Sequence, residues 1–309
     1  MQTLESLKRS IASAEDLGSV VRTMKAMAAV SIRQYETATE SLTEYARTID
    51  TGLAMLMRHT CDDFTESAAN GRTGAVVFGS DQGMCGQFNE QVAQFAMDSL
   101  LAGAEEVSQQ APVICVGQRV ADKLSDANFG IHHTFSLPGS VDGITPLVQE
   151  LLAAIDGWRA RYSLQRISVF HNRRLTSSSW QPHVMQLLPL NFERLKTQHD
   201  AADSHSVPPE NDSTSAPHNA NRSLPLWTMD SDVLFSRLVK QFLFVSLFQA
   251  CAESLAGENA SRIAAMQAAE RNINDRLQEL RSDFSRQRQT TITEELLDVV
   301  TGYEALTQG

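Results

Sequence analysis

The sequence has 309 residues, a formal net charge of −11 and a pI near 5.2. This acidic balance argues against a nucleic-acid-binding protein, because contacts to phosphate need clustered Lys and Arg side chains. The chain has no uninterrupted apolar run of about eighteen residues, so no transmembrane segment is predicted. Residues 1–13 are polar and charged. No secretory signal peptide is therefore predicted, and we expect a soluble intracellular protein.

Apolar residues recur at steps of three and four from residue 3 to about residue 58, which predicts a long first helix. The middle of this seam, Met24–Val30, reads MKAMAAV. Small residues on a seam let a second helix approach closely, and methionines fill the irregular gaps beside it. The seam residues include Leu4, Leu7, Ile11, Val21, Met24, Ala28, Tyr35, Leu42, Ile49 and Leu53.

The middle of the chain alternates between short apolar runs and segments of helical periodicity. The predicted strands are residues 75–78, 111–116 and 166–172, with 183–190 as an edge strand. The predicted helices are residues 89–101, 117–127 and 145–161. This alternation predicts an open α/β sheet with Rossmann-like winding over residues 73–195.

Residues 198–223 differ in composition from the segments on either side. They hold three prolines and one large aliphatic residue, Val207. Such a segment cannot bury enough apolar surface to offset the entropy lost on ordering, so a disordered loop is predicted.

The last stretch, from about residue 230 to residue 306, contains no proline and only two glycines, Gly257 and Gly302. Its apolar residues again fall at alternating steps of three and four, as in a coiled coil. Roughly seventy helical residues would extend about 105 Å, so this helix needs an equally long partner. The seam residues are Ile263, Met266, Ile273, Leu277, Leu280, Phe284, Ile292, Leu296, Val299, Tyr303 and Leu306.

The first segment can supply that partner, because all nine prolines lie between Pro112 and Pro225. We therefore predict a protein of mixed α+β and α/β class. A long antiparallel two-helix coiled coil would form from residues 1–60 and 226–309, and the α/β domain would fold between the two helices.

The turn Ser80–Gly86 (SDQGMCG) follows a predicted strand and precedes a helix. Its backbone N–H groups could hold a phosphate, as in an α/β enzyme or a nucleotide-binding protein. However, the turn matches neither GxGxxG nor the Walker motif, and Cys85 has no histidine nearby in the sequence. The favoured interpretation is a tight turn in which Gly83 and Gly86 supply permissive backbone angles.

Neither the histidines nor the cysteines form a recognisable metal site. The cysteines have no CxxC spacing, and we expect reduced, mostly buried thiols. The histidines show no i, i+4 pair of the kind that binds zinc on a helix. The cysteines are Cys61, Cys85, Cys115 and Cys251, and the histidines beyond residue 60 are His132, His133, His171, His183, His199, His205 and His218.

Charged and polar residues interrupt the last seam. An arginine at such a position weakens a coiled coil unless it meets something outside the helix pair. One alternative is that the cluster is solvated where the partner helix has ended. The other is that this end of the helix protrudes beyond its partner and contacts another protein, and the spacing favours this second alternative. For Arg262, a solvated flank is the simpler alternative to a contact with a surrounding subunit. The cluster comprises Arg286, Arg288, Gln289, Thr293, Glu294 and Glu295.

Several stretches in this order resemble the γ subunit, the central stalk, of F-type ATP synthases. They are VRTMKAMAAVSIR ending at Arg33, GSDQGMCGQFN (Gly79–Asn89), LLPL (Leu187–Leu190), ENASRIAAMQAAERN (Glu258–Asn272) and RQTTITEELLDVVTGYEAL (Arg288–Leu306). Together they span nearly the whole chain, and the last stretch is highly specific.

The resemblance implies a rotor subunit without catalytic, cofactor or metal sites. The coiled coil would stand inside the α3β3 hexamer of α and β subunits, and the α/β domain would contact the ε subunit and the c-ring. Rotation would couple ion flow to ATP synthesis or hydrolysis. The resemblance assigns subunit contacts that transmit torque to Arg288, Gln289, Thr293 and Glu295, and contacts lower on the shaft to Met24 and Arg262.

Some features depart from that family pattern. The first arm is not basic: residues 1–50 hold Lys or Arg at 8, 9, 22, 25, 33 and 47 against acids at 5, 15, 16, 36, 40, 44 and 50. LPLWTMD (Leu224–Asp230) replaces the usual signature at the foot. These departures resemble the divergent alternate (N-type) F-type ATPases, which move H⁺ or Na⁺. The expected location is the cytoplasmic face of a bacterial inner membrane, as a peripheral protein.

Overall fold

The computed structural model describes residues 3–60, 72–102, 112–174, 180–190 and 227–307. The predicted loop at 198–223 and Cys61 lie outside these residues. The chain divides into two compact units. We call Met1–Val30, Met84–Gly86 and Asn259–Gly309 the coil unit, and Ser31–Gly83 and Gln87–Glu258 the sheet unit.

Two long helices contribute to both units. Helix α1 spans Leu4–Thr60 and helix α6 spans Ser231–Thr307. Neither contains a proline, and continuous helix is therefore possible over their whole lengths. The two predicted terminal helices are confirmed.

The helices run antiparallel within each unit. In the coil unit, Glu15 pairs with Arg281 at 2.7 Å, and Lys25 pairs with Glu270. In the sheet unit, the Tyr45 hydroxyl donates a hydrogen bond to Gln241 Oε1 at 3.2 Å. Later residues of α1 thus meet earlier residues of α6 in both units.

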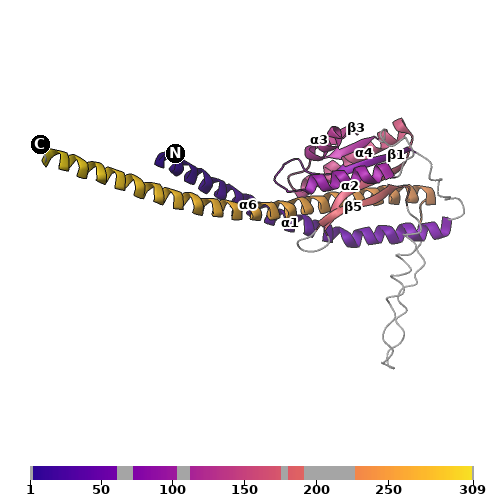
Figure 1. Ribbon diagram of the computed structural model, residues 1–309. Helices are drawn as coiled ribbons and strands as arrows, with labels where there is room; N and C mark the ends of the chain where they lie inside the picture. Colours follow the sequence, from indigo (N-terminus) through magenta and orange to yellow (C-terminus); the bar gives the residue numbers. More distant parts are fainter. Residues whose placement is uncertain (1–2, 61–71, 103–111, 175–179, 191–226, 308–309) are drawn as a thin grey trace, which may run out of the picture. The chain divides into compact units, whose positions relative to one another are not determined.

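The sheet unit contains one five-stranded mixed sheet in the order β3-β2-β1-β4-β5 (Figure 1). The first four strands in this order are parallel, and β5 runs antiparallel to β4 at the edge. The strands are β1 (Arg72–Phe78), β2 (Val113–Val116), β3 (Ile131–Phe135), β4 (Leu164–Arg174) and β5 (Trp180–Leu188).

Helices cover both faces of this sheet. On β1, Ala75 and Val77 point to the face covered by α2 (Phe88–Ala102) and α3 (Gln118–Asp126). Val76 and Phe78 point to the other face, where α4 (Ile144–Tyr162) and the first part of α6 pack. A strand buried on both faces needs an unbroken apolar run, and AVVF is such a run.

The sequence predicted every one of these elements except β3 and a short 3-10 turn, Val141–Gly143. Strand β3 reads IHHTF, and both histidines are exposed at the sheet edge. Neither apolar alternation nor an apolar run marks it.

Helix α6 contains, within Ser231–Thr301, an 18-residue window of mean hydropathy 1.3 with at most two charged residues. It is the one helix in the described residues that length and composition would allow to cross a membrane. The sequence prediction of no transmembrane segment considered only uninterrupted apolar runs, so it did not take this window into account. Core helices of soluble proteins meet the same criterion, and part of α6 does line the core described above.

Candidate functional site

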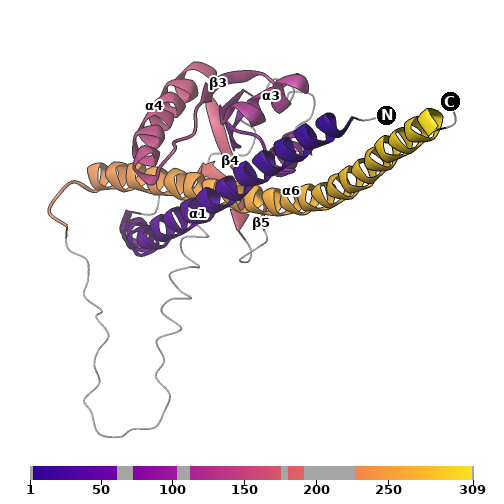
Figure 2. The ribbon, with the colours of Figure 1, turned by 90° about the vertical axis from the view of Figure 1, so that its left-hand side faces the viewer.

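Among the residues that the structure describes, no second helix lies beside the end of α6 in the coil unit. Both views show α6 continuing past the first residues of α1 (Figures 1 and 2). The pairing of Glu15 with Arg281 places the start of α1, Leu4, about eleven residues farther along α6. The helix around and beyond that point is largely solvent-exposed, and we call residues 286–303 the tip.

All four predicted contact residues at the tip are exposed: Arg288, Gln289, Thr293 and Glu295. The Thr293 hydroxyl donates a hydrogen bond to the carbonyl of Gln289 at 2.9 Å, within the helix. Among the described residues, no ion pair forms with Arg288 or Glu295. These side chains are therefore available to a second protein.

The tip also exposes apolar side chains, among them four residues of the predicted seam: Ile292, Leu296, Val299 and Tyr303. Burial along that seam ends with Leu277 and Leu280. Contiguous apolar exposure of this kind marks an interaction surface in a soluble protein. The exposed tip residues are Ile292 50%, Leu296 61%, Leu297 55%, Val299 74%, Val300 43% and Tyr303 68%. This exposure agrees with the favoured hypothesis that the tip extends beyond its partner helix.

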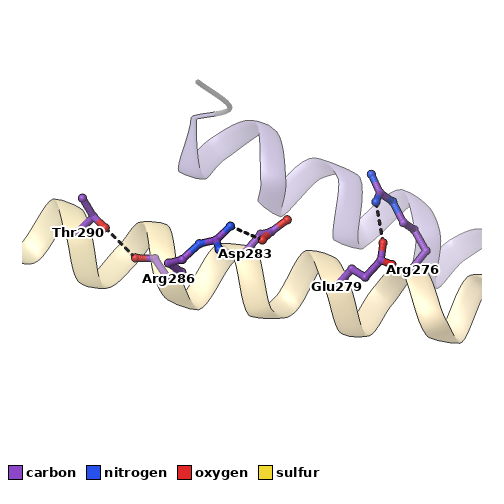
Figure 3. A network of polar contacts seen from close by, with 5 residues as sticks. All are labelled: Arg276, Glu279, Asp283, Arg286 and Thr290. Carbon is purple, nitrogen blue, oxygen red and sulfur yellow. Dashed lines mark hydrogen bonds and ion pairs between the residues drawn. The ribbon is translucent and has the colours of Figure 1, made fainter.

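Just before the tip and at its start, charged side chains of α6 pair along their own helix (Figure 3). Arg276 contacts Glu279, and Arg286 contacts Asp283, each at 2.8 Å and three residues apart. Thr290 donates to the carbonyl of Arg286 at 3.1 Å. Arg286, although part of the predicted cluster, is already neutralised within the helix, which distinguishes it from Arg288.

The two predicted residues lower on the shaft have different environments. Met24 is half-buried on α1. Arg262 is only 9% exposed, and its Nη1 donates to Asn259 Oδ1 at 3.3 Å. The isolated chain therefore covers Arg262 far more than Arg288, and the coil unit does not bring Arg262 together with the tip residues.

The sequence did not identify the ion pair between Lys25 and Glu270, which joins the two helices of the coil unit. The hydrogen bond from Lys25, with the nearby charges of Lys25 and Arg22, holds the pKa of Glu270 below its ordinary value. This pair, with that of Glu15 and Arg281, fixes one register of the antiparallel seam.

The turn after β1 satisfies its own polar groups. The Ser80 amide donates to Asn89 Oδ1 at 2.9 Å, and Asn89 Nδ2 donates to Ser80 Oγ at 2.8 Å. The Asp81 carboxylate accepts from the amides of Gln118, at 2.9 Å, and Leu137, at 2.8 Å. A carboxylate at this position would also repel a phosphate. These contacts favour a structural role for the turn over a phosphate-binding role.

The end of this turn belongs to the coil unit. The Ser261 hydroxyl on α6 donates a hydrogen bond to the Cys85 carbonyl. Met84 and Gly86 on either side have positive φ angles, 61° and 59°. This confirms the permissive angle predicted for Gly86, but the same prediction for Gly83 is wrong: Met84, which is not a glycine, adopts that region instead.

Cys85, Cys115 and Cys251 are buried free thiols, as the sequence predicted. Burial raises the pKa of Cys115 to about 12, which makes it a poor nucleophile at neutral pH. Within the described residues, no group of three His, Cys, Asp or Glu side chains could hold a metal ion.

A buried polar contact in the sheet unit was also missed. His171 Nε2 on β4 lies 3.1 Å from Glu253 Oε2 on α6. The two residues are 82 positions apart, so no local spacing could have indicated their contact.

The comparisons with known proteins agree with the resemblance. A family model described as ATP synthase matches residues 3–306. The ATP synthase gamma chain of Sinorhizobium fredii is 27% identical, covering 99% of this chain and 100% of that protein. The gamma chain of Granulibacter bethesdensis is 26% identical with the same coverage.

Solved structures show the same fold. A chain of the Euglena gracilis mitochondrial ATP synthase rotor has a TM-score of 0.57 and 17% identity, covering 94% of this chain and 98% of its own length. A chain from the Euglena OSCP/F1/c-ring assembly has a TM-score of 0.62 and 16% identity, covering 98% and 94%. With the family model matching residues 3–306, the chain belongs to the ATP synthase gamma family.

Proposed function

We propose that this chain is the central-stalk rotor of an F1F0 ATP synthase or ATPase. It couples ion flow through a membrane ring to ATP synthesis or hydrolysis in an α3β3 hexamer. The observation that carries the proposal is the family match over residues 3–306, which includes both long helices and the sheet. The chain itself performs no bond chemistry, and it requires α, β and ε subunits and a c-ring as partners.

The tip supplies the contacts with the hexamer. Arg288, Gln289, Thr293 and Glu295 carry polar groups to the surrounding subunits, while the exposed apolar residues between them form a low-friction surface. For rotation to change nucleotide affinity, each β conformation must contact the tip with a different free energy. Met24 and Arg262 make a second set of contacts lower on the shaft. Burial of Arg262 means that its contact needs a small rearrangement of its side chain.

The sheet unit serves as the foot of the rotor. The strand order β3-β2-β1-β4 with parallel pairing supports Rossmann-like winding, and β5 adds an antiparallel edge. We assign contacts with the ε subunit and the c-ring to this unit. We propose the predicted division into domains 1–60, 73–195, 198–223 and 226–309, in which each long helix is one domain although it contributes to both compact units.

The departures of the sequence from the common family pattern support an alternate, N-type complex. The first arm, which lacks the usual basic excess, and the LPLWTMD segment, Leu224–Asp230, carry this assignment. The protein would then lie at the cytoplasmic face of a bacterial membrane, with H⁺ or Na⁺ as the coupling ion. The ion-binding helix of the accompanying c subunit distinguishes the two ions.

Removal of the tip's polar groups tests the proposal. In the assembled complex, Arg288→Ala with Gln289→Ala should lower ion pumping driven by ATP about tenfold, because a hydrogen bond to a charged group contributes about 1.5–3 kcal/mol. The thermal unfolding of the isolated chain should not change, since both side chains are exposed.

The matched control is Gln149→Ala with Arg159→Ala, which removes the same two side-chain types from the exposed side of α4. This control should pump at the wild-type rate. Wild-type pumping and assembly in the tip variant would contradict the role assigned to the tip.

A further inference from the structure

One carboxylate on α6 gathers polar contacts from the sheet. Glu253 Oε2 lies 3.1 Å from His171 Nε2 and 3.8 Å from Arg173 Nε, both on β4. Its other oxygen accepts a hydrogen bond from Gln249 Nε2 at 3.0 Å. The His171 side chain is 4% exposed and that of Glu253 14%. A buried charged contact thus joins β4 to α6 inside the sheet unit.

The carboxylate is ionised in the folded protein. Burial by itself raises the pKa of Glu253, but hydrogen bonds from His171 and Gln249 and the charges of His171 and Arg173 outweigh it and hold the pKa below its ordinary value. A carboxylate can only accept hydrogen bonds, so His171 carries a proton on Nε2. Within the described residues, His171 Nδ1 has no hydrogen-bond partner, so only Nε2 makes the contact.

The contact lies on one face of the helix. Gln249, Glu253 and Gly257 follow one another at steps of four residues, which places them in a row along α6. At Gly257 the helix lies against β4, because a Cβ atom there would be in van der Waals contact, at 3.5 Å, with the carbonyl oxygen of Asn172. Glu253 and Gly257 therefore lie on the face of α6 that contacts β4, one helical turn apart.

The rest of this interface is apolar. Ala250 and Ala256, which lie on the same side of α6 as Glu253, belong to the same core as Val169 of β4. Apolar burial is non-directional, so such packing tolerates a small roll or slide of a helix. A hydrogen bond to a charged group depends on direction and distance, and it would be lost on rolling.

We propose that His171, Arg173 and Glu253 form a rotation lock, which fixes the rotation of α6 about its own axis on the sheet so that torque passes between them without slip. The inference rests on the proposed rotor function. The polar groups around the carboxylate are His171 and Arg173 from β4 and Gln249 from α6, and His183 of β5 lies opposite His171 with ring centroids 5.5 Å apart.

Two substitutions of His171 that differ little in size distinguish a hydrogen-bonded lock from a purely packing role of this side chain. His171→Gln keeps a donor near the position of Nε2, whereas His171→Asn places its donor near the position of Nδ1, away from Glu253. In the assembled complex, we expect the Gln variant to pump the wild-type number of ions per ATP hydrolysed. The Asn variant should hydrolyse ATP but lose about tenfold in pumping.

The isolated full-length chain gives a second measurement that needs no partner. Hydrogen exchange of the amides of residues 167–172 and 250–257 should be about tenfold faster in the Asn variant than in the Gln variant or wild type. Equal pumping by both variants, together with equal exchange, would overturn the lock.

The two proposals fail in different ways. A wild-type chain that never assembles with α and β subunits contradicts the rotor function, and the exchange measurement then still decides whether β4 holds α6 through Glu253. An assembled complex in which both variants lose pumping equally contradicts the lock alone. Glu90→Gln, which breaks an exposed ion pair with Lys123 at 2.9 Å, is the matched control and should change neither readout.

Discussion

The two units of this chain differ in how far they bury their apolar and charged side chains. The sheet unit buries both: its apolar residues fill two cores, and its Glu253 is covered and paired. The coil unit ends in a tip where six large apolar residues are between 43% and 74% exposed. A domain that satisfies its own groups can be stable alone, whereas an exposed apolar helix gains free energy from a surrounding partner. The sheet unit is thus self-sufficient, and the tip is built for contact.

Among these variants, the largest loss of stability should come from removing an aromatic ring from the sheet unit. Phe170 is 1% exposed and packs edge-on against Phe95 with ring centroids 6.0 Å apart. We expect Phe170→Ala to lower the free energy of unfolding by about 3–5 kcal/mol, because it leaves a cavity. Urea titration of the isolated chain measures this change.

Truncation of an apolar side chain at the tip tests whether exposed tip residues contribute less to stability than buried residues of the sheet unit. Leu296→Ala should change the free energy of unfolding by less than about 0.5 kcal/mol, because the side chain is 61% exposed. A comparable loss of stability in both variants would mean that the tip is covered in the isolated chain, and the contrast between the two units would then be wrong.

A loss of stability smaller than that of Phe170→Ala is expected from replacing a glycine that the sheet unit requires. Gly117 has a φ angle of +115°, and a Cβ there would lie 2.8 Å from the Ser80 backbone nitrogen. Gly117→Ala should therefore destabilise the protein by about 1–3 kcal/mol, measured as a shift of the urea midpoint. A Cβ atom at Gly130 would meet nothing within 4 Å, so Gly130→Ala is the control and should leave stability unchanged or slightly raised.

The smallest expected effect is on the pH dependence of stability. Since the pKa of Glu253 in the fold lies below the ordinary value of 4.5, the unfolded chain binds more protons at this group as pH falls. The group therefore contributes stability above its unfolded pKa, and that contribution disappears as pH falls through the folded pKa. Urea midpoints measured from pH 6 downward should fall less steeply for Glu253→Gln than for wild type. Parallel slopes would show that Glu253 has no stabilising partners.

Much of this fold follows from the sequence because its elements carry strong local signals. The run Ala75–Phe78 predicts a strand buried on both faces, and the two proline-free segments predict long helices. Strand β3 was missed because His132 and His133 are exposed at the sheet edge, where nothing requires apolar residues. The exposed tip was favoured because charged residues interrupt the seam there, whereas the seam alone does not indicate where its partner helix ends.

The contact residues were less predictable than the fold. The resemblance identified Arg288 and Gln289, and the structure shows both exposed. It also identified Arg262, which the structure shows largely buried. The contact of His171 with Glu253 joins residues 82 positions apart, and only the folded arrangement brings them together. Local patterns thus specify the elements, while polar contacts between distant elements emerge only in the folded chain.

The most direct test of the central claim is rotation itself. The full-length chain, assembled with α and β subunits held on a surface, would carry a bead on the exposed side of α4. We predict stepwise rotation in one direction when ATP is added, at a rate that falls in the Arg288→Ala, Gln289→Ala variant. A complex that hydrolyses ATP while the bead stays still, or a chain that never joins α and β subunits, would contradict the account.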